Sequence, residues 1–399
     1  MTKTKILVLS WEFPPRLVGG IARHVAELYP EIVKFDYEIH LVTVAVADSP
    51  QIEEVEGIYV HRVSIPPNNN LFDWIRQMNN SMYDYCENLL TKMGDFALIH
   101  GHDWLIADSA IPLKHRFKIP LVATIHATEY GRNNGIHNAT QSYVFNQEKK
   151  LAYESWRVIV CTEYMRNEVH KILTCPFDKI DIIYNGIPAE KKSSLDKFDS
   201  QKFRSHFAKD DEKIIYYVGR MTYEKGVQIL IEAMPRVLQA TDRKTRCVIV
   251  GGGDTSEWQN LACCLGIQDY CIFTGFMPDE DLNRFTTIAD CAVFPSLYEP
   301  FGIVVLESFA SFVPVVVSDA GGLPEVVRHE ETGIVTQKKN SDSLAWGILE
   351  ILENPDFGKT LAHNAYDDLL ERFHWSKLAK QTIEVYKTVL QARKNVTWE

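Results

Sequence analysis

The segment Cys291-Ala-Val-Phe-Pro-Ser-Leu-Tyr-Glu-Pro-Phe-Gly-Ile-Val-Val-Leu-Glu307 contains the parts of one α/β unit. Its opening, residues 291–295, is apolar and predicts a buried strand. The Glu299-Pro-Phe-Gly302 part cannot continue regular structure, because Pro300 has no backbone donor and favours extended geometry at Glu299. The apolar spacing from Ile303 to Phe312 then predicts a helix. The segment therefore predicts a strand, a loop and a helix, the repeating unit of an α/β fold.

Two carboxylates, Glu299 and Glu307, flank the start of this predicted helix. A helix N-terminus carries unpaired N–H groups and a partial positive charge, which suit a phosphate. Carboxylates on each side of an anion site indicate a ligand with hydroxyls next to phosphates, such as a nucleotide sugar. A surface helix with solvated acids is the alternative, and the spacing alone leaves it open.

The rest of the chain repeats this alternation of strand and helix. Strands are predicted at residues 5–10, 38–43, 59–63, 98–103, 121–126, 157–161 and 180–184, and again at 213–218, 246–251, 271–274, 291–295, 314–318 and 333–335. Such Val/Ile-rich runs between helices, for example those predicted at 21–33 and 71–93, indicate parallel sheets buried on both faces. Open sheets of this kind bind ligands beyond the carboxyl ends of their strands.

With 399 residues the chain is long enough for two domains. The stretch Asn185–Ser200 begins with turn chemistry and continues with charged and small residues, so it predicts the boundary. We expect a first domain over 1–190 and a second over 191–374, with a cleft between them as the natural site. The last helical pattern, about Trp375 to Lys394, is expected to pack back on the first domain.

Composition excludes several classes of protein. The net charge of −11 argues against nucleic-acid binding, and no apolar run is long enough to span a membrane. The cysteines form no Cys-x-x-Cys pairs, and Cys161, Cys247 and Cys291 fall in apolar runs. They are typical of reduced thiols in the core of a cytoplasmic protein.

Two further segments suit a diphosphate. Gly19 and Gly20 follow the first strand and open a helix, where backbone N–H groups could approach a phosphate. Arg220 leaves the carboxyl end of a strand and Lys225 starts the next helix, so the two cations could grip a diphosphate from two directions. A pair of solvated surface cations is the alternative.

Polar residues also end two strands of the first domain. His100 and His102 would share one strand face, which suits a metal, but no clustered third and fourth ligand is visible. His126 could present a polar group to a sugar, and Asp103 could accept from a sugar hydroxyl.

Asp279-Glu280-Asp281 superficially matches an Asp-x-Asp metal motif, but it precedes a helical pattern. The acids are expected to cap that helix, so we predict no catalytic metal.

These motifs together resemble the retaining glycosyltransferases of the GT-B fold, in particular family 4 and the glycogen and starch synthases. The resemblance rests on Gly219-Arg220 with Lys225-Gly226, on Glu299-Pro-Phe-Gly302 with Glu307, and on Gly321-Gly-Leu-Pro-Glu325. His-Asp-Trp at 102–104 and Tyr-Asn-Gly-Ile at 184–187 are similar to glycogen synthases. The resemblance implies two Rossmann-like domains whose parallel sheets face each other across a cleft.

The resemblance also implies roles for individual residues. Arg220 and Lys225 would bind the donor diphosphate, Glu299 a donor-sugar hydroxyl and Glu307 the ribose hydroxyls. The remaining implied site residues are backbone donors to phosphate and sugar (Gly20, Gly302, Ile303, Val304), the residues beside the reacting sugar (His126, Asp103) and a residue that lines the same cleft (Asn185).

The implied reaction moves a hexosyl group, glucosyl in the favoured version, from a UDP-, ADP- or GDP-sugar to an acceptor hydroxyl with retention of configuration, and it needs no other cofactor. α-Glucan synthesis is the most specific version. The chain departs from the family pattern at one position. Bacterial glycogen synthases that use ADP-glucose carry Lys two residues before their Gly-Gly pair, where this chain has Leu17, next to Arg16. This difference argues against ADP as the nucleotide and against α-glucan synthesis.

Other functions stay open. The acceptor could be a lipid, a sugar phosphate or a surface glycan, and the transferred sugar could be mannose. A GT-B epimerase or phosphorylase would share the architecture. A non-catalytic sugar-nucleotide-binding protein is the alternative outside enzymes. The polar, glycine-bearing stretch at 132–138 could be an acceptor loop, or an ordinary exposed loop.

Overall fold

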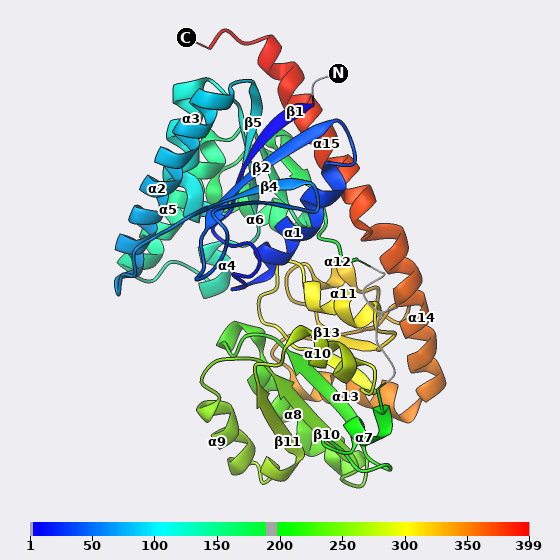
Figure 1. The fold of residues 1–399 in the computed structure, drawn as a ribbon. Helices are drawn as coiled ribbons and strands as arrows, with labels where there is room; N and C mark the ends of the chain where they lie inside the picture. The colour runs from blue at the N-terminus through cyan, green and yellow to red at the C-terminus, as the bar shows by residue number, and fades with distance from the viewer. Residues whose placement is uncertain (1–2, 189–197, 399) are drawn as a thin grey trace. The chain divides into compact units, whose positions relative to one another are not determined.

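The computed structural model describes residues 3–188 and 198–398. The chain forms two compact units (Figure 1). Unit 1 comprises Met1–Gly186 together with Trp375–Glu399, and unit 2 comprises Ile187–His374. The predicted boundary between residues 190 and 191 lies outside the described residues.

Unit 1 is built on an eight-stranded sheet of order β3-β4-β2-β1-β5-β6-β7-β8. Its strands are β1 (Thr4–Leu9), β2 (Tyr37–Val44), β3 (Ile52–Val55), β4 (Ile58–Val63), β5 (Phe96–His102), β6 (Leu121–Ile125), β7 (Arg157–Val160) and β8 (Ile180–Ile182). All pairs are parallel except β3 with β4. None of the strands predicted from the sequence covers β3, whose Glu53 and Glu54 leave it without an apolar run.

Helices cover both faces of this sheet. They are α1 (Gly20–Ile32), α2 (Leu71–Met93), α3 (Ala107–Phe117), α4 (Glu129–Asn133), α5 (Ala139–Glu154), α6 (Glu163–Leu173) and α15 (Trp375–Lys394). Helices α1 and α15 share one apolar core with the strands, in which Tyr29 and Tyr386 are fully buried. Helices α2 and α3 share the core on the other face. The last helix of the chain is therefore an integral part of unit 1 (Figure 1).

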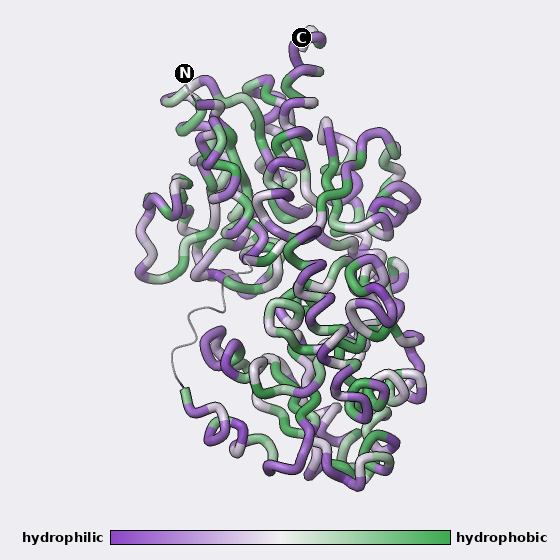
Figure 2. Tube along the Cα trace, turned by 90° about the vertical axis from the view of Figure 1, so that its right-hand side faces the viewer, coloured by the Kyte–Doolittle hydropathy of each residue, from purple (hydrophilic) through white to green (hydrophobic). Residues whose placement is uncertain are grey.

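Unit 2 contains a six-stranded parallel sheet of order β11-β10-β9-β12-β13-β14. Its strands are β9 (Lys213–Val218), β10 (Thr245–Val250), β11 (Cys271–Gly275), β12 (Cys291–Phe294), β13 (Val315–Ser318) and β14 (Ile334–Thr336). Its helices are α7 (Ser200–Arg204), α8 (Val227–Ala240), α9 (Ser256–Cys264), α10 (Asp279–Thr286), α11 (Ile303–Phe309), α12 (Leu323–Val326), α13 (Ser341–Glu353) and α14 (Pro355–Arg372). Figure 2 shows apolar residues gathered toward the inside of each unit and many polar residues on its outer turns.

One predicted helix is shorter than expected. The apolar pattern predicted a helix to Phe312, but α11 ends at Phe309. The N–H groups of Ser311 and Phe312 bond three residues back, to Ser308 and Phe309, which tightens the last turn. Phe312 then adopts φ 53°, a left-handed conformation that stops the helix.

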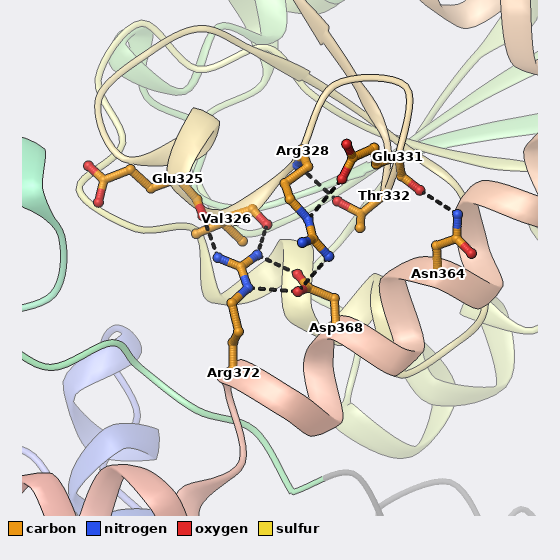
Figure 3. A network of polar contacts seen from close by, with 8 residues as sticks. All are labelled: Glu325, Val326, Arg328, Glu331, Thr332, Asn364, Asp368 and Arg372. Carbon is orange, nitrogen blue, oxygen red and sulfur yellow. Dashed lines mark hydrogen bonds and ion pairs between the residues drawn. The ribbon is translucent and has the colours of Figure 1, made fainter.

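A polar network joins α14 to the segment around α12 (Figure 3). The Arg372 guanidinium donates to the carbonyl oxygens of Glu325 and Val326 at 2.8 and 3.0 Å and also pairs with Asp368. Arg328 donates to the same Asp368 carboxylate at 2.8 Å. The network fixes the end of the Gly321–Glu325 segment, whose beginning touches the candidate site.

Among the helices within residues 3–188 and 198–398, none is both long and apolar enough to cross a membrane.

Candidate functional site

In unit 2, two of the predicted site residues form an ion pair. Lys225 Nζ donates to Glu299 Oε2 at 2.7 Å. Lys225 ends the turn after β9 and Glu299 lies in the loop after β12, and these two strands are neighbours in the sheet. The Glu299 residue is only 9% exposed. The carboxyl ends of the central strands therefore hold one cation and one anion in direct contact.

Close backbone approach explains the glycine that follows Lys225. Gly226 has φ +74°, and a Cβ there would lie 1.9 Å from the Pro295 carbonyl oxygen. The Leu297 N–H also donates to the Glu224 carbonyl at 2.7 Å. Only glycine lets the β9 turn lie against the β12 loop in this way.

The Gly321-Gly322 pair supports Glu299 from the other side. The Gly322 N–H donates to the Glu299 carbonyl at 2.8 Å. Gly321 has φ +61°, and a Cβ there would lie 2.1 Å from the same oxygen. Three separate motifs of the sequence, at 225–226, 299–302 and 321–325, thus meet around one carboxylate residue.

Arg220 differs from Lys225 in its exposure. Its side chain is 59% exposed and pairs with Glu224 at 3.3 Å. Because an exposed pair of this kind contributes little to stability, the guanidinium can exchange Glu224 for a phosphate at small cost.

The helix start at α11 has the predicted form. Gly302 is its N-cap with φ 96°, and Ile303 and Val304 are the first two helical residues. Their N–H groups precede the first intrahelical bonds. Glu307 lies one turn further along α11 and is partly exposed.

The Asp279–Asp281 acids form the first turn of α10, as the dipole argument requires. The N-cap is Pro278, which has no side-chain cap bond, so the expected side-chain cap is wrong. Glu280 and Asp281 pair with Arg284 one turn later.

In unit 1, the first βα turn is held by a residue that the sequence prediction missed. The buried Glu12 carboxylate accepts from the N–H groups of Val18 and Gly19 at 2.8 and 2.9 Å. Burial raises the pKa of Glu12. The Gly19 N–H is therefore bound within the protein and does not serve a phosphate, which leaves Gly20 at the start of α1 as the candidate. Nothing in the residue pattern distinguished Glu12 from a solvated glutamate.

A cluster of four histidines lies at the carboxyl ends of β5 and β6. We call His24, His100, His102 and His126 the histidine cluster. The rings of His100 and His102 stack at 4.6 Å, so they share one strand face as predicted. His102 Nδ1 and His126 Nε2 are 3.1 Å apart, and the His24 ring contacts the His126 ring at 4.8 Å.

The fold thus brings two further histidines to His100 and His102, which the sequence did not show. His24 and His126 come from α1 and from the residue after β6, and only the fold brings them to β5. Burial lowers the pKa of His126 to about 3 and those of His24 and His102 well below the ordinary value. The cluster is thus uncharged at neutral pH.

Asp103 and Asn185 are both attached to this cluster. The buried Asp103 carboxylate accepts from the backbone N–H of His126 at 2.8 Å, and burial raises the pKa of Asp103 to about 6. Asn185 Oδ1 lies 2.8 Å from His24 Nδ1. Asp103 has a φ of +60°, so the strand end turns sharply where it presents this side chain.

Glu148 of α5 is a second buried acid that the sequence did not indicate. Its Oε1 accepts from the Glu129 N–H at 2.8 Å, and its Oε2 has no partner among the described residues. Burial raises the pKa of Glu148 to about 8. The predicted acceptor loop at 132–138 is also partly regular, because residues 132–133 end α4 and Asn138 caps α5.

Comparison with known proteins gives two family models and many relatives. A model described as "Glycosyltransferase Family 4" matches residues 18–191, and one described as "Glycosyl transferases group 1" matches residues 198–368. An uncharacterized glycosyltransferase of Methanocaldococcus jannaschii is 38% identical over 97% of this chain and 99% of its own. A glycogen synthase of Mycobacterium tuberculosis is 32% identical over 96% of this chain and 94% of its own.

A solved structure has the same fold. The sucrose-phosphate synthase of Thermosynechococcus elongatus superposes with a TM-score of 0.82 at 23% identity, covering 98% of this chain and 100% of that one. Both halves of the chain, and not only the motifs of unit 2, take part in these similarities.

Proposed function

The chain belongs to the GT-B glycosyltransferases of the family 4 and glycogen synthase group, and we propose that it transfers a glucosyl group, with retention of configuration, from a nucleoside diphosphate sugar to an acceptor hydroxyl. The single observation that carries this proposal is the Lys225–Glu299 ion pair at the carboxyl ends of β9 and β12. A cation there suits a diphosphate, and the carboxylate beside it suits a sugar hydroxyl.

We assign the donor to unit 2. Arg220 and Lys225 neutralise the diphosphate, and the first N–H groups of α11, at Ile303 and Val304, donate to its oxygens. The Gly302 N–H adds a donor on the preceding loop. Glu307 accepts from the ribose hydroxyls, as the family pattern implies. Because side chains and backbone supply this positive charge, the proposed reaction uses no metal at Asp279 or Asp281.

We assign the transferred sugar to groups at the carboxyl ends of the unit 1 strands. His126 is uncharged and partly exposed, so it can exchange hydrogen bonds with a sugar hydroxyl without bringing a second cation. Asp103 uses one oxygen to hold the His126 backbone, and its other oxygen can accept from a hydroxyl. Gly20 supplies a backbone contact to the diphosphate, and Asn185 a polar group beside His24.

The proposed chemistry needs no enzyme nucleophile. The acceptor oxygen forms the new bond to the anomeric carbon on the face from which the diphosphate departs. The bond from that carbon to the phosphate oxygen breaks, and the leaving oxygen takes the acceptor proton. The protein contributes positioning and stabilisation of the negative charge on the leaving group, an effect of about 3 kcal/mol for each well-placed donor.

An α-glucan is the acceptor that we favour. The similarity to a glycogen synthase supports it. Unit 1 also has aromatic side chains near the strand ends: Tyr143 is 40% exposed and contacts the rings of Phe72 and Trp104 at 5.1 and 6.3 Å. Sugar rings pack on such amphipathic faces. The buried thiols of Cys247 and Cys291 support our placement of the enzyme in the cytoplasm.

A donor screen tests the proposal. We expect one nucleoside diphosphate glucose among the UDP, ADP and GDP forms to raise the melting temperature, because a ligand that binds the folded state stabilises it by mass action. The same donor should transfer glucose to a maltooligosaccharide, with the α-configuration of the product read by proton NMR. A β-linked product, or no stabilisation by any of these donors, would contradict the proposal.

A further inference from the structure

Three members of the histidine cluster converge on one point. One ring nitrogen each from His24, His102 and His126 lies within 4.8 Å of the other two. The residues come from α1, from the end of β5 and from the segment after β6, so the packing of unit 1 alone brings them together. His24 and His102 are buried, and His126 is partly exposed.

His24 has the hydrogen-bonding pattern of a ligating histidine. Its Nδ1 lies 2.8 Å from Asn185 Oδ1, and because an amide oxygen only accepts, Nδ1 carries the proton. Nε2 therefore keeps its lone pair, and it has no hydrogen-bond partner within the described part of the chain. A buried acceptor without a partner is costly, whereas a second-shell carbonyl on the other nitrogen is what orients metal-binding histidines.

His102 and His126 are spaced as two ligands of one ion. Their Nδ1 and Nε2 atoms are 3.1 Å apart. Two nitrogens bound to tetrahedral zinc at about 2.0–2.1 Å lie roughly 3.4 Å apart. The Tyr29 hydroxyl lies 2.7 Å from His102 Nε2 and can accept its proton, which leaves Nδ1 as the ligand atom. His126 then needs only to carry its proton on Nδ1 for Nε2 to bind.

We propose that His24 Nε2, His102 Nδ1 and His126 Nε2 bind one Zn²⁺ ion, with a water molecule as the fourth ligand. Neutral imidazoles suit Zn²⁺ and Co²⁺, whereas Mg²⁺ requires oxygen ligands, which this set does not offer. Because the three ring nitrogens lie within 4.8 Å of one another, the His24 ring needs to move by at most about 1.4 Å to reach the tetrahedral spacing.

The functional consequence rests on the proposed function. His126 is the residue assigned to the transferred sugar, so an ion that binds its Nε2 takes this contact away and fills the adjacent space. Zn²⁺ therefore inhibits transfer, although the reaction itself uses no metal.

Cobalt binding tests the site without any assay of transfer. We expect the purified chain to bind one Co²⁺ with the intense visible bands of a tetrahedral ion, and Zn²⁺ but not Mg²⁺ to remove them. His24→Asn keeps a donor to Asn185 but lacks the Nε2 ligand, and it should weaken Co²⁺ affinity by more than about 100-fold, since even second-shell losses reach that size.

His61→Asn is the matched control. His40 and His61 form another buried pair in unit 1, with ring nitrogens 3.0 Å apart, but they do not belong to the group of three. This variant should bind Co²⁺ like the wild type. Equal Co²⁺ affinity in the wild type and His24→Asn would overturn the proposal.

A second variant guards against misfolding of the first. Tyr29→Phe removes the hydroxyl at His102 Nε2 and leaves all three ligands, so we expect a loss of about 10- to 100-fold in affinity. For the functional consequence, Zn²⁺ should inhibit glucosyl transfer by the wild type at concentrations that leave His24→Asn at its own uninhibited rate. If no nucleotide sugar supports transfer at all, the proposed function fails, while the Co²⁺ titration still decides the metal site.

Discussion

The polar side chains at the strand ends are charged in the sheet of unit 2 and uncharged in the sheet of unit 1. In unit 2, Lys225 and Glu299 form a charged pair, and exposed Arg220 adds a second cation. In unit 1, His24, His102 and His126 are uncharged because burial disfavours their protonated forms. A charged pair responds strongly to an anionic ligand, whereas neutral imidazoles offer lone pairs and N–H groups. The difference suits a diphosphate in unit 2 and sugar hydroxyls, or a transition metal, in unit 1.

The largest effect is expected from removing the anion of unit 2. Glu299→Ala deletes the proposed sugar-hydroxyl contact and leaves Lys225 without its partner. We expect kcat to fall by about 1000-fold, which corresponds to roughly 4 kcal/mol of transition-state stabilisation. Glu280→Ala is the matched control, because Glu280 is an exposed acid that pairs with Arg284 on α10. A glucosyl-transfer rate within a few-fold of wild type for Glu299→Ala would remove Glu299 from the site.

The two cations should differ in their contribution to binding. Lys225→Ala leaves the buried Glu299 charge facing the diphosphate, so we expect nucleoside diphosphate affinity to fall by about 100-fold, in the range of a charge-assisted hydrogen bond of about 1.5–3 kcal/mol. Arg220→Ala removes a more exposed charge and should cost about 10-fold. Calorimetric titration measures both.

Arg236→Ala is the control for this pair, since Arg236 of α8 forms an exposed ion pair with Asp342 at 3.0 Å. Its affinity for the nucleotide should match the wild type. If neither Lys225→Ala nor Arg220→Ala weakened binding, the diphosphate would have to lie elsewhere, and the contrast between the two units would lose its functional meaning.

The strands were largely predictable from the sequence, because buried parallel strands produce apolar runs of a typical length. β3 was not predictable, since Glu53 and Glu54 gave it the pattern of a solvated segment. The close approach of three unit 2 motifs was also open to prediction, because Lys225–Gly226, Glu299–Gly302 and Gly321–Glu325 are short, and Gly226, Gly302 and Gly321 each have a local steric reason.

The unit 1 groups could not be found in this way. His24 lies 78 residues before His102 in the printed sequence, and only the register of β1, β5 and β6 makes them neighbours. The buried acids Glu12 and Glu148 look like ordinary surface residues in the sequence. Their burial depends on which helix face packs inward, which a single sequence does not report.

The pH dependence of the unfolding free energy should distinguish a buried acid of unit 1 from a buried acid of unit 2. Glu148 in unit 1 has a pKa raised to about 8 by burial, above its ordinary value near 4.5. Between those pH values the folded state holds a proton that the unfolded state releases, so Glu148 lowers stability as pH rises through this window. Glu148→Gln should therefore become stabilising relative to wild type, by up to about 1.4 kcal/mol for each pH unit.

Glu212 in unit 2 provides the comparison. Its hydrogen bond from Arg246, at 2.7 Å, lowers its pKa, so its stabilising contribution is present above the unfolded pKa and is lost in acid. Glu212→Gln should destabilise at neutral pH, and this effect should disappear as the pH falls through the lowered pKa of the folded state. Urea unfolding across pH measures how the free energy of unfolding of each variant, relative to wild type, changes with pH. If this change had the same sign in both variants, burial would not set the protonation of Glu148.

The smallest expected effect is that of chelation. If Arg220, Lys225 and the start of α11 neutralise the diphosphate, EDTA should leave the initial rate of glucosyl transfer unchanged, because no step requires a divalent ion. EDTA should also restore a Zn²⁺-inhibited sample to its full rate, since the ion at the histidine cluster only blocks His126. If EDTA abolished activity and Mg²⁺ or Mn²⁺ restored it, the reaction would require a metal ion with oxygen ligands. Asp279 and Asp281 would then be the candidate ligands. The effect of EDTA on the rate therefore distinguishes two sources of positive charge at the diphosphate: the side chains of the protein, or a divalent metal ion bound from solution.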